Sequence, residues 1–164
     1  MKKLLFLILM LLPLSLFAQE KLAYVNSQEI IQAMPEFVEA QKTMEKFNTD
    51  YQKELKTLQD EYNKKYSDFV QQQDSLTDNI KQHRMQELQD IQQRTDLYMQ
   101  NTQQEAQKKQ QDLFNPIQDK VRTAIKAVGD EKGYTYIFDA ANFLYMGTSA
   151  TNATAAVKTK LGLK

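Results

Sequence analysis

Residues 36–71 read EFVEAQKTMEKFNTDYQKELKTLQDEYNKKYSDFVQ, and this stretch decides the fold. Its apolar or small side chains recur in steps of three and four residues, and nine such steps span 32 residues, a mean period of about 3.56. Because this period lies between the coiled-coil value of about 3.5 and the free-helix value of about 3.6, it predicts one long helix with a narrow apolar seam. The seam residues are Phe37, Ala40, Met44, Phe47, Tyr51, Leu55, Leu58, Tyr62, Tyr66 and Phe69.

The stretch from 36 to 115 contains neither Gly nor Pro, although Pro35 and Pro116 stand at its two ends. A compact domain depends on tight turns, which use these residues most often. The stretch is therefore not a compact domain by itself. Within it, residues 100–112 have Ala106 as their only apolar side chain, which fits either a solvated helix or an under-packed, flexible length of helix.

Turn-favouring side chains cluster at 74–78, where Ser75 and Asp78 have the spacing of a capping box. Apolar side chains then resume at helical spacing. We therefore expect residues 36–116 to form a long antiparallel helical hairpin, a coiled-coil arm that projects from the rest of the chain and has its tip near 74–78. Positions that face each other across it should sum to about 152, which pairs Leu55 with Leu97 and Tyr98, Tyr62 with Ile91, Tyr66 with Leu88, and Phe47 with Ala106.

The segments on either side of the arm, 19–35 and 117–164, are expected to form one small β-containing body. Pro116 should kink the second arm helix or mark a restart, and Gly129 should end it. The fold class is thus α+β, mostly α. The elements expected in the body are strands at 21–26, 134–138 and 143–147, a turn at 139–142, a short helix at 28–34, and a last helix from Asn152 or Thr154 to Leu161.

A body of this size forms a marginal core on its own, and three short strands leave sheet edges exposed unless another copy covers them. We therefore expect a homo-oligomer whose body strands meet across subunits. The residues expected to build this oligomerisation body are Tyr24, Val25, Tyr136, Ile137, Phe138, Leu144 and Tyr145.

Residues 1–18 have the pattern of a signal peptide, in which Lys2 and Lys3 precede an apolar run and Ala18 is the small residue at the cleavage point. The apolar run, Leu4 to Leu12, is shorter than the roughly 20 residues of a transmembrane helix. We expect a soluble exported protein once these residues are removed.

Composition argues against most catalytic and nucleic-acid functions. The chain has no Cys and a single His, His83, and it carries 21 basic and 21 acidic side chains. The absence of Cys excludes a thiol nucleophile and a thiolate metal site. No catalytic arrangement and no phosphate-binding Gly-rich loop is visible in the sequence. Because basic and acidic side chains balance, the chain has no net positive potential that would attract nucleic acid. We expect no catalytic residues, no metal site, no cofactor and no enzyme activity.

Several segments, taken in order, resemble the Skp or OmpH family of periplasmic chaperones. They are LAYVN at 22–26, the helical hairpin, IFDAAN at 137–142 with Tyr145, and NATAAV at 152–157. The resemblance implies a homotrimer in which the bodies form an intersubunit β-barrel and three helical tentacles enclose a cavity. The implied function is that of an ATP-independent holdase, which carries unfolded outer-membrane β-barrel proteins across the periplasm.

Known members of that family have basic arms, whereas residues 36–128 carry 14 basic and 16 acidic side chains here. The resemblance therefore gives no basis for expecting this protein to contact lipopolysaccharide or a membrane surface. The alternative function is a structural or adaptor coiled-coil protein of the cell envelope without chaperone activity. Six arm residues are candidates for client binding, although packing within the hairpin is the simpler role for each: Phe47, Tyr51, Tyr66, Phe69, Tyr98 and Met99.

Overall fold

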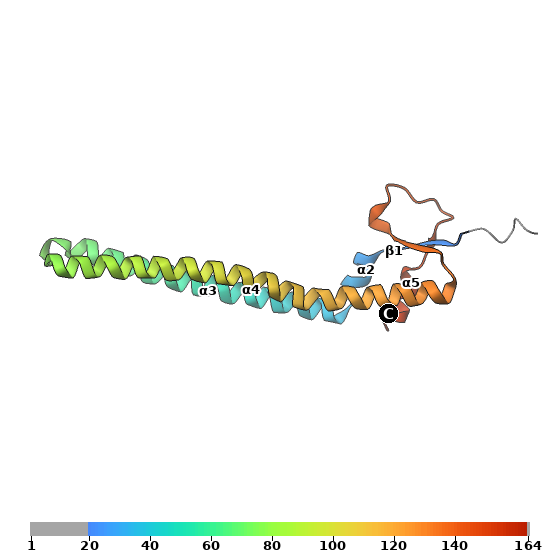
Figure 1. The fold of residues 1–164 in the computed structure, drawn as a ribbon, viewed down its shortest axis with the longest axis horizontal. Helices are drawn as coiled ribbons and strands as arrows, with labels where there is room; N and C mark the ends of the chain where they lie inside the picture. The colour runs from blue at the N-terminus through green and yellow to red at the C-terminus, as the bar shows by residue number, and fades with distance from the viewer. Residues whose placement is uncertain (1–19, 164) are drawn as a thin grey trace, which may run out of the picture. The chain divides into compact units, whose positions relative to one another are not determined.

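The structure, a computed structural model, describes residues 20–163, so the expected signal peptide lies outside the described residues. The chain divides into two compact units, which Figure 1 shows as a helical hairpin and a small mixed unit. We call residues Pro35–Ile117 the arm, and the other described residues, 20–34 and 118–163, the body. The fold is α+β and mostly helical.

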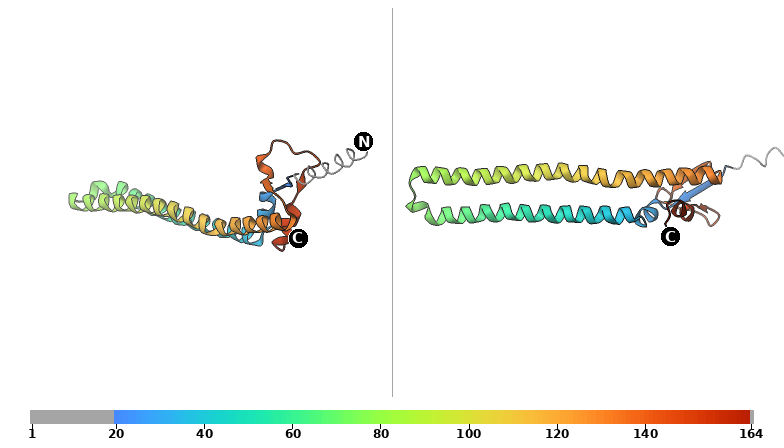
Figure 2. Two further views of the ribbon diagram at one scale, coloured as in Figure 1. Left: turned by 45° about the vertical axis from the view of Figure 1, so that its right-hand side comes forward. Right: turned by 90° about the horizontal axis from the view of Figure 1, so that it is seen from below.

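The arm consists of two antiparallel helices that lie side by side along their length (Figure 2). Helix α3 (Pro35–Gln72) is followed by the short 3-10 helix η1 (Gln73–Ser75), and α4 (Asp78–Lys132) begins after two intervening residues. The chain thus reverses within the segment where the tip was expected. The capping-box prediction was wrong, because the Ser75 hydroxyl donates to the Gln72 carbonyl at 2.8 Å and so closes the preceding turn.

Contacts between α3 and α4 follow the expected register closely. Phe37 meets Phe114 edge-on with ring centroids 5.8 Å apart, and the Gln92 side-chain amide donates to the Tyr62 hydroxyl at 3.1 Å. Leu97 was expected to face Leu55 but is half exposed, since the neighbouring Tyr98 occupies the interface instead. The side chains buried along the arm are Ala40, Leu58, Leu88, Ile91, Thr102 and Ile117.

Helix α4 continues without restart through Pro116 and also through Gly129, so the prediction that it ends at Gly129 was wrong. It ends at Lys132, and Gly133 follows in the left-handed region with φ of 66°. The Tyr134 N–H donates to the Gly129 carbonyl at 3.0 Å, as in a Schellman motif. Gly133 is therefore the residue whose conformation ends the helix.

The body contains a three-stranded parallel sheet with the strand order β2-β1-β3. Strand β1 (Leu22–Val25) lies between β2 (Tyr136–Asp139) and β3 (Thr151–Asn152), and the remaining elements are α2 (Ser27–Gln32), η2 (Ala140–Asn142) and α5 (Thr154–Lys160). The strand expected at 143–147 is absent from the described structure, and this prediction was wrong. Both edges of β1 are taken by β2 and β3, and within the described residues the segment 143–147 pairs with the outer edge of neither strand.

Only one face of the sheet is covered within the body. Ala23 and Val25 point into the core, and Ile137 on the neighbouring strand approaches Gly129 of α4 closely enough that a Cβ there would lie 3.4 Å from its Cδ1 atom. Asn26 caps α2 by accepting from the Glu29 N–H at 3.0 Å. The other buried core side chains are Ile30, Met34, Val121, Ala124, Val128, Ala153 and Val157.

Candidate functional site

The arm does not bury the six predicted client-binding residues completely. Phe47, Tyr51, Phe69 and Tyr98 are half buried, while Tyr66 is 51% exposed and Met99 is 45% exposed. Tyr66 stacks on Tyr62 of the same helix, with centroids 6.1 Å apart, and so lies beside the seam. Four of the six, Phe47, Tyr51, Tyr98 and Met99, come together in the middle of the arm, whereas Tyr66 and Phe69 lie nearer the tip.

The middle of the arm contains a groove of about 490 Å³ that we call the amide groove. It forms because Thr102 and Ala106 are too small to fill the space opposite Phe47 and Tyr51. Met99 adds a flexible apolar wall, and such side chains adapt to partners of different shapes. Amide side chains at its rim can donate to and accept from an extended backbone, and they are Asn48, Gln100 and Gln103.

A second groove of about 270 Å³ shares Phe47, Tyr51 and Thr102 with the first, and we call it the acidic groove. Tyr98 adds an aromatic wall to it. Three exposed carboxylates complete its lining, namely Asp50, Glu54 and Glu105. The apolar periodicity alone did not reveal these polar residues, although they occupy the helical positions that flank the seam.

The part of the arm near the tip is held by polar bonds between the two helices. The Lys65 ammonium donates to Glu87 Oε2 at 3.3 Å, and Arg84 donates to the same oxygen at 3.3 Å. The bond from Lys65 is the main reason that the pKa of Glu87 lies below its ordinary value of 4.5, and Arg84 lowers it further. His83, 74% exposed at its side chain, lies 3.9 Å from the other Glu87 oxygen.

Further apolar side chains of the arm remain exposed outside the grooves. They lie on both helices, so a chain lying along the arm would meet apolar contacts at several levels. These residues are Val38, Val70, Ile80, Met85 and Leu97.

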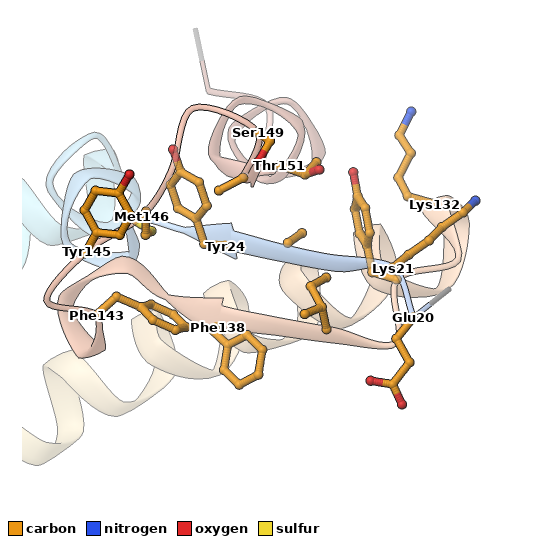
Figure 3. Close-up of a pocket in the computed structure, with 14 residues that line it drawn as sticks. Glu20, Lys21, Tyr24, Lys132, Phe138, Phe143, Tyr145, Met146, Ser149 and Thr151 are labelled. Atoms are coloured by element: carbon orange, nitrogen blue, oxygen red, sulfur yellow. The ribbon is translucent and has the colours of Figure 1, made fainter. Parts of the chain in front are cut away.

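The uncovered face of the body sheet is aromatic. Because paired residues of parallel strands point to the same side, Leu22 and Tyr24 share a face with Tyr136 and Phe138. We call these four residues the aromatic face. Phe143 meets Phe138 edge-on at 5.4 Å, and Figure 3 shows Tyr24, Phe138, Phe143 and Tyr145 gathered around β1 and β2.

A cavity of about 1000 Å³ lies over this part of the body. Leu144, in the segment between η2 and β3, is fully exposed, and Tyr145 is 84% exposed. Val25 and Ile137, which were expected among the residues of the oligomerisation body, lie on the covered side of the sheet. A group of large, solvent-exposed apolar side chains in one part of a protein is typical of a protein interface.

Residues 20–163 contain neither a candidate metal site nor a candidate membrane span. No group of His, Cys, Asp or Glu side chains in this part of the chain could hold a metal ion. No helix among the same residues is both long and apolar enough to span a bilayer.

Comparison with known proteins identifies a family and a similar solved structure. A family model described as outer membrane protein (OmpH-like) matches residues 21–161. A crystal structure of a candidate outer membrane chaperone (OmpH-like) from Caulobacter crescentus aligns with a TM-score of 0.76 and 12% identity, covering 88% of this chain and 85% of that one. No curated protein sequence matches the chain.

Proposed function

The chain belongs to the OmpH-like family, and from this premise we propose that it is an ATP-independent holdase chaperone of the periplasm. It would act as a soluble protein after loss of residues 1–18, bind unfolded outer-membrane β-barrel proteins and prevent their aggregation on the way to the outer membrane. The observation that best supports this proposal is the arm itself, which keeps aromatic and apolar side chains half exposed in shallow grooves along a stable hairpin.

Shallow grooves suit the capture of unfolded chains better than the recognition of one folded ligand. Each groove offers a few contacts, so a single contact would be weak. Several arms acting together would hold a client through effective concentration without any tight site. Release would need no nucleotide, because a client that reaches a more stable folded state leaves by mass action.

The body supports assembly into a homotrimer. Strand β2 pairs only with β1 within the described residues, so its outer edge can accept a strand from a second copy. Residues 143–147 are apolar and aromatic, as strands often are, but form no strand pairing within the described residues. We propose that three bodies close into an intersubunit barrel in which this segment, with Leu144 and Tyr145, meets the neighbouring subunit and covers the aromatic face.

The arm of this protein would hold clients mainly through shape and apolar contact. Its nearly balanced charge gives no strong field toward lipopolysaccharide or a membrane surface. The arm charges that pair across the hairpin near its tip, such as Arg94 with Glu61 at 3.1 Å, cross-link the helices.

A dilution assay tests the holdase proposal. A urea-denatured outer-membrane β-barrel protein is diluted into buffer with residues 19–164, and light scattering reports aggregation. We expect the wild-type protein to suppress scattering in proportion to its concentration. If the client aggregates equally fast with and without the protein, the holdase proposal is wrong and the structural or adaptor function is favoured.

An arm-shortened variant separates capture from assembly. Tyr62 and Gln92 are bonded across the hairpin, so residues 60 and 92 lie opposite each other and a short turn can replace the segment between them. This variant should still assemble through its body but should lose most of its protection, because its arms no longer enclose a client. Full protection by the variant would contradict the proposed role of the arms.

A further inference from the structure

Thr102 is the exception among the threonines that α3 and α4 contribute to the arm, Pro35–Ile117. The others, Thr43, Thr49, Thr57 and Thr95, each donate to the carbonyl four residues earlier at 2.8–3.0 Å. The Thr102 side chain makes no hydrogen bond within the described chain, although the residue is only 8% exposed. No fully buried side-chain oxygen of the described residues lacks a partner, so the Thr102 hydroxyl must reach solvent.

Thr102 lines both the amide groove and the acidic groove. In the acidic groove it lies among Phe47, Tyr51 and Tyr98. An unpartnered hydroxyl that reaches solvent from a residue nine-tenths buried in the wall of a groove is a vacant hydrogen-bonding position for a bound group.

The charge of the acidic groove indicates which group would fit. Asp50, Glu54 and Glu105 line it without any basic residue in its lining, and none of the three forms an ion pair within the described chain. They do not form a cluster that could hold a metal ion. Separated carboxylates around aromatic rings instead suit a larger, delocalised cation that can contact ring and carboxylate together.

One aromatic ring of this groove already has a cation beside it. The Lys109 ammonium lies 5.4 Å from the centroid of the Phe47 ring. Tyr51 and Tyr98, whose rings stack with centroids 5.6 Å apart, have no such partner among the described residues. Cations are attracted to the faces of aromatic rings and not to their positive edges. Both tyrosines are half buried, so the ring surface that their stacking leaves uncovered, with the carboxylates around it, is open to a cation from another molecule.

We propose that the acidic groove binds a basic side chain, preferably arginine, of an extended unfolded polypeptide. The guanidinium lies against the Tyr51 and Tyr98 rings, donates to the Thr102 hydroxyl, and is neutralised by the three carboxylates. This inference deepens the proposed holdase function and rests on it for the identity of the polypeptide as a client. It adds a charge-selective contact to an arm that is otherwise nearly neutral.

The test measures binding of short fluorescent peptides to full-length mature protein by anisotropy. The peptides are extended and identical except at one position, which holds arginine or its uncharged isostere citrulline. We expect wild-type protein to bind the arginine peptide about five- to tenfold more tightly. In the triple variant D50N/E54Q/E105Q this preference should fall to near unity.

A matched triple variant, D68N/D96N/D112N, removes the same net charge at exposed arm positions outside the groove. It should keep the preference for arginine. If the two triple variants lose the preference equally, or if wild-type protein never shows it, the groove assignment is overturned. The peptide substitution leaves the protein unchanged, so a folding defect cannot produce that second result.

The dilution assay on the same samples keeps the two proposals apart. Wild-type protein that suppresses aggregation without preferring arginine retains the holdase function and overturns the groove assignment. Wild-type protein that prefers arginine at this groove but does not suppress aggregation supports the groove and overturns the holdase function. Substitution T102V should reduce the preference for the arginine peptide at least twofold, which would support a direct contact of the hydroxyl with the guanidinium. An unchanged preference would overturn the role assigned to the hydroxyl.

Discussion

Tyr51 of α3 and Tyr98 of α4 stack across the arm with ring centroids 5.6 Å apart and ring planes 26° apart. Both rings border the acidic groove, so one contact joins the two helices and shapes the candidate binding surface. Stacked aromatic pairs contribute about 0.5–1.5 kcal/mol beyond their buried area. The middle of the arm should therefore depend on this pair more than on any exposed apolar residue.

Replacing Tyr98 by Leu keeps an apolar side chain but removes the ring contact. We expect amide hydrogen exchange around residues 47–51 and 98–106 to accelerate by about five- to tenfold, which corresponds to about 1 kcal/mol of local opening free energy. The matched control is Y66L, because Tyr66 stacks only within its own helix. Equal acceleration at the middle of the arm in both variants would contradict a special role for the Tyr51–Tyr98 pair.

Replacing Leu144 by Asp tests the proposed subunit interface. Leu144 is fully exposed in a single chain, so the substitution should leave the folded body intact while a charge at a buried intersubunit position prevents assembly. Sedimentation velocity should then show monomers under conditions in which we expect the wild-type protein to sediment as a trimer. The control is L97D on the arm, at a leucine that is 50% exposed. A trimer that persists in L144D would contradict the interface.

The ion pairs around Glu87 should make the outer arm sensitive to acid. The Lys65 ammonium, followed by Arg84, holds the pKa of Glu87 below 4.5, so the ionised carboxylate favours the folded arm. This contribution is fully present above the unfolded-state pKa and is lost as the pH falls through the lower folded-state pKa. The stability difference between wild-type protein and E87Q should therefore shrink as the pH is lowered from about 6 to about 3.

Hydrogen exchange of amides near residues 62–70 and 81–91 measures this effect locally. The control substitution is E45Q, at an exposed carboxylate with no ion pair among the described residues. The difference in local stability between E45Q and the wild-type protein should not show the pH dependence expected for E87Q. A difference between wild type and E87Q that stays constant over this pH range would show that the carboxylate's charge contributes nothing to the folded arm.

The hairpin could be predicted from sequence because its cause is local. Side chains at steps of three and four share one helix face, and two such faces in one chain bury each other, so the register follows from the tip. The contact of Phe37 with Phe114 agrees with that register within about one helical residue. The partner of Glu87 was not predictable in the same way, since Lys64 and Lys65 are adjacent and only the rotation of α3 decides which one faces α4.

The wrong prediction of a strand at 143–147 has a different cause, which is dependence on non-local structure. Residues 143–147 have strand-like composition, but pairing depends on whether the fold brings a segment beside a free strand edge, and within the described residues this segment pairs with none. The grooves at the middle of the arm were only partly foreseen. The thin apolar seam at 100–112 suggested weak packing, but the open hydroxyl of Thr102 depends on the size of its neighbours across the hairpin.

The end of α4 gives a paired prediction at two glycines. Gly133 has φ of 66°, and a Cβ there would touch nothing within 4 Å, so G133A acts only through backbone strain. We expect it to destabilise the body by about 1–2 kcal/mol, because alanine disfavours the left-handed region. Gly129 lies inside the helix, and its added Cβ would make ordinary contact with Ile137 at 3.4 Å. G129A should therefore be neutral or stabilise the body by up to about 1 kcal/mol. Thermal unfolding of the two variants measures both effects, and the opposite order would place the helix end at Gly129, where the sequence alone had suggested it.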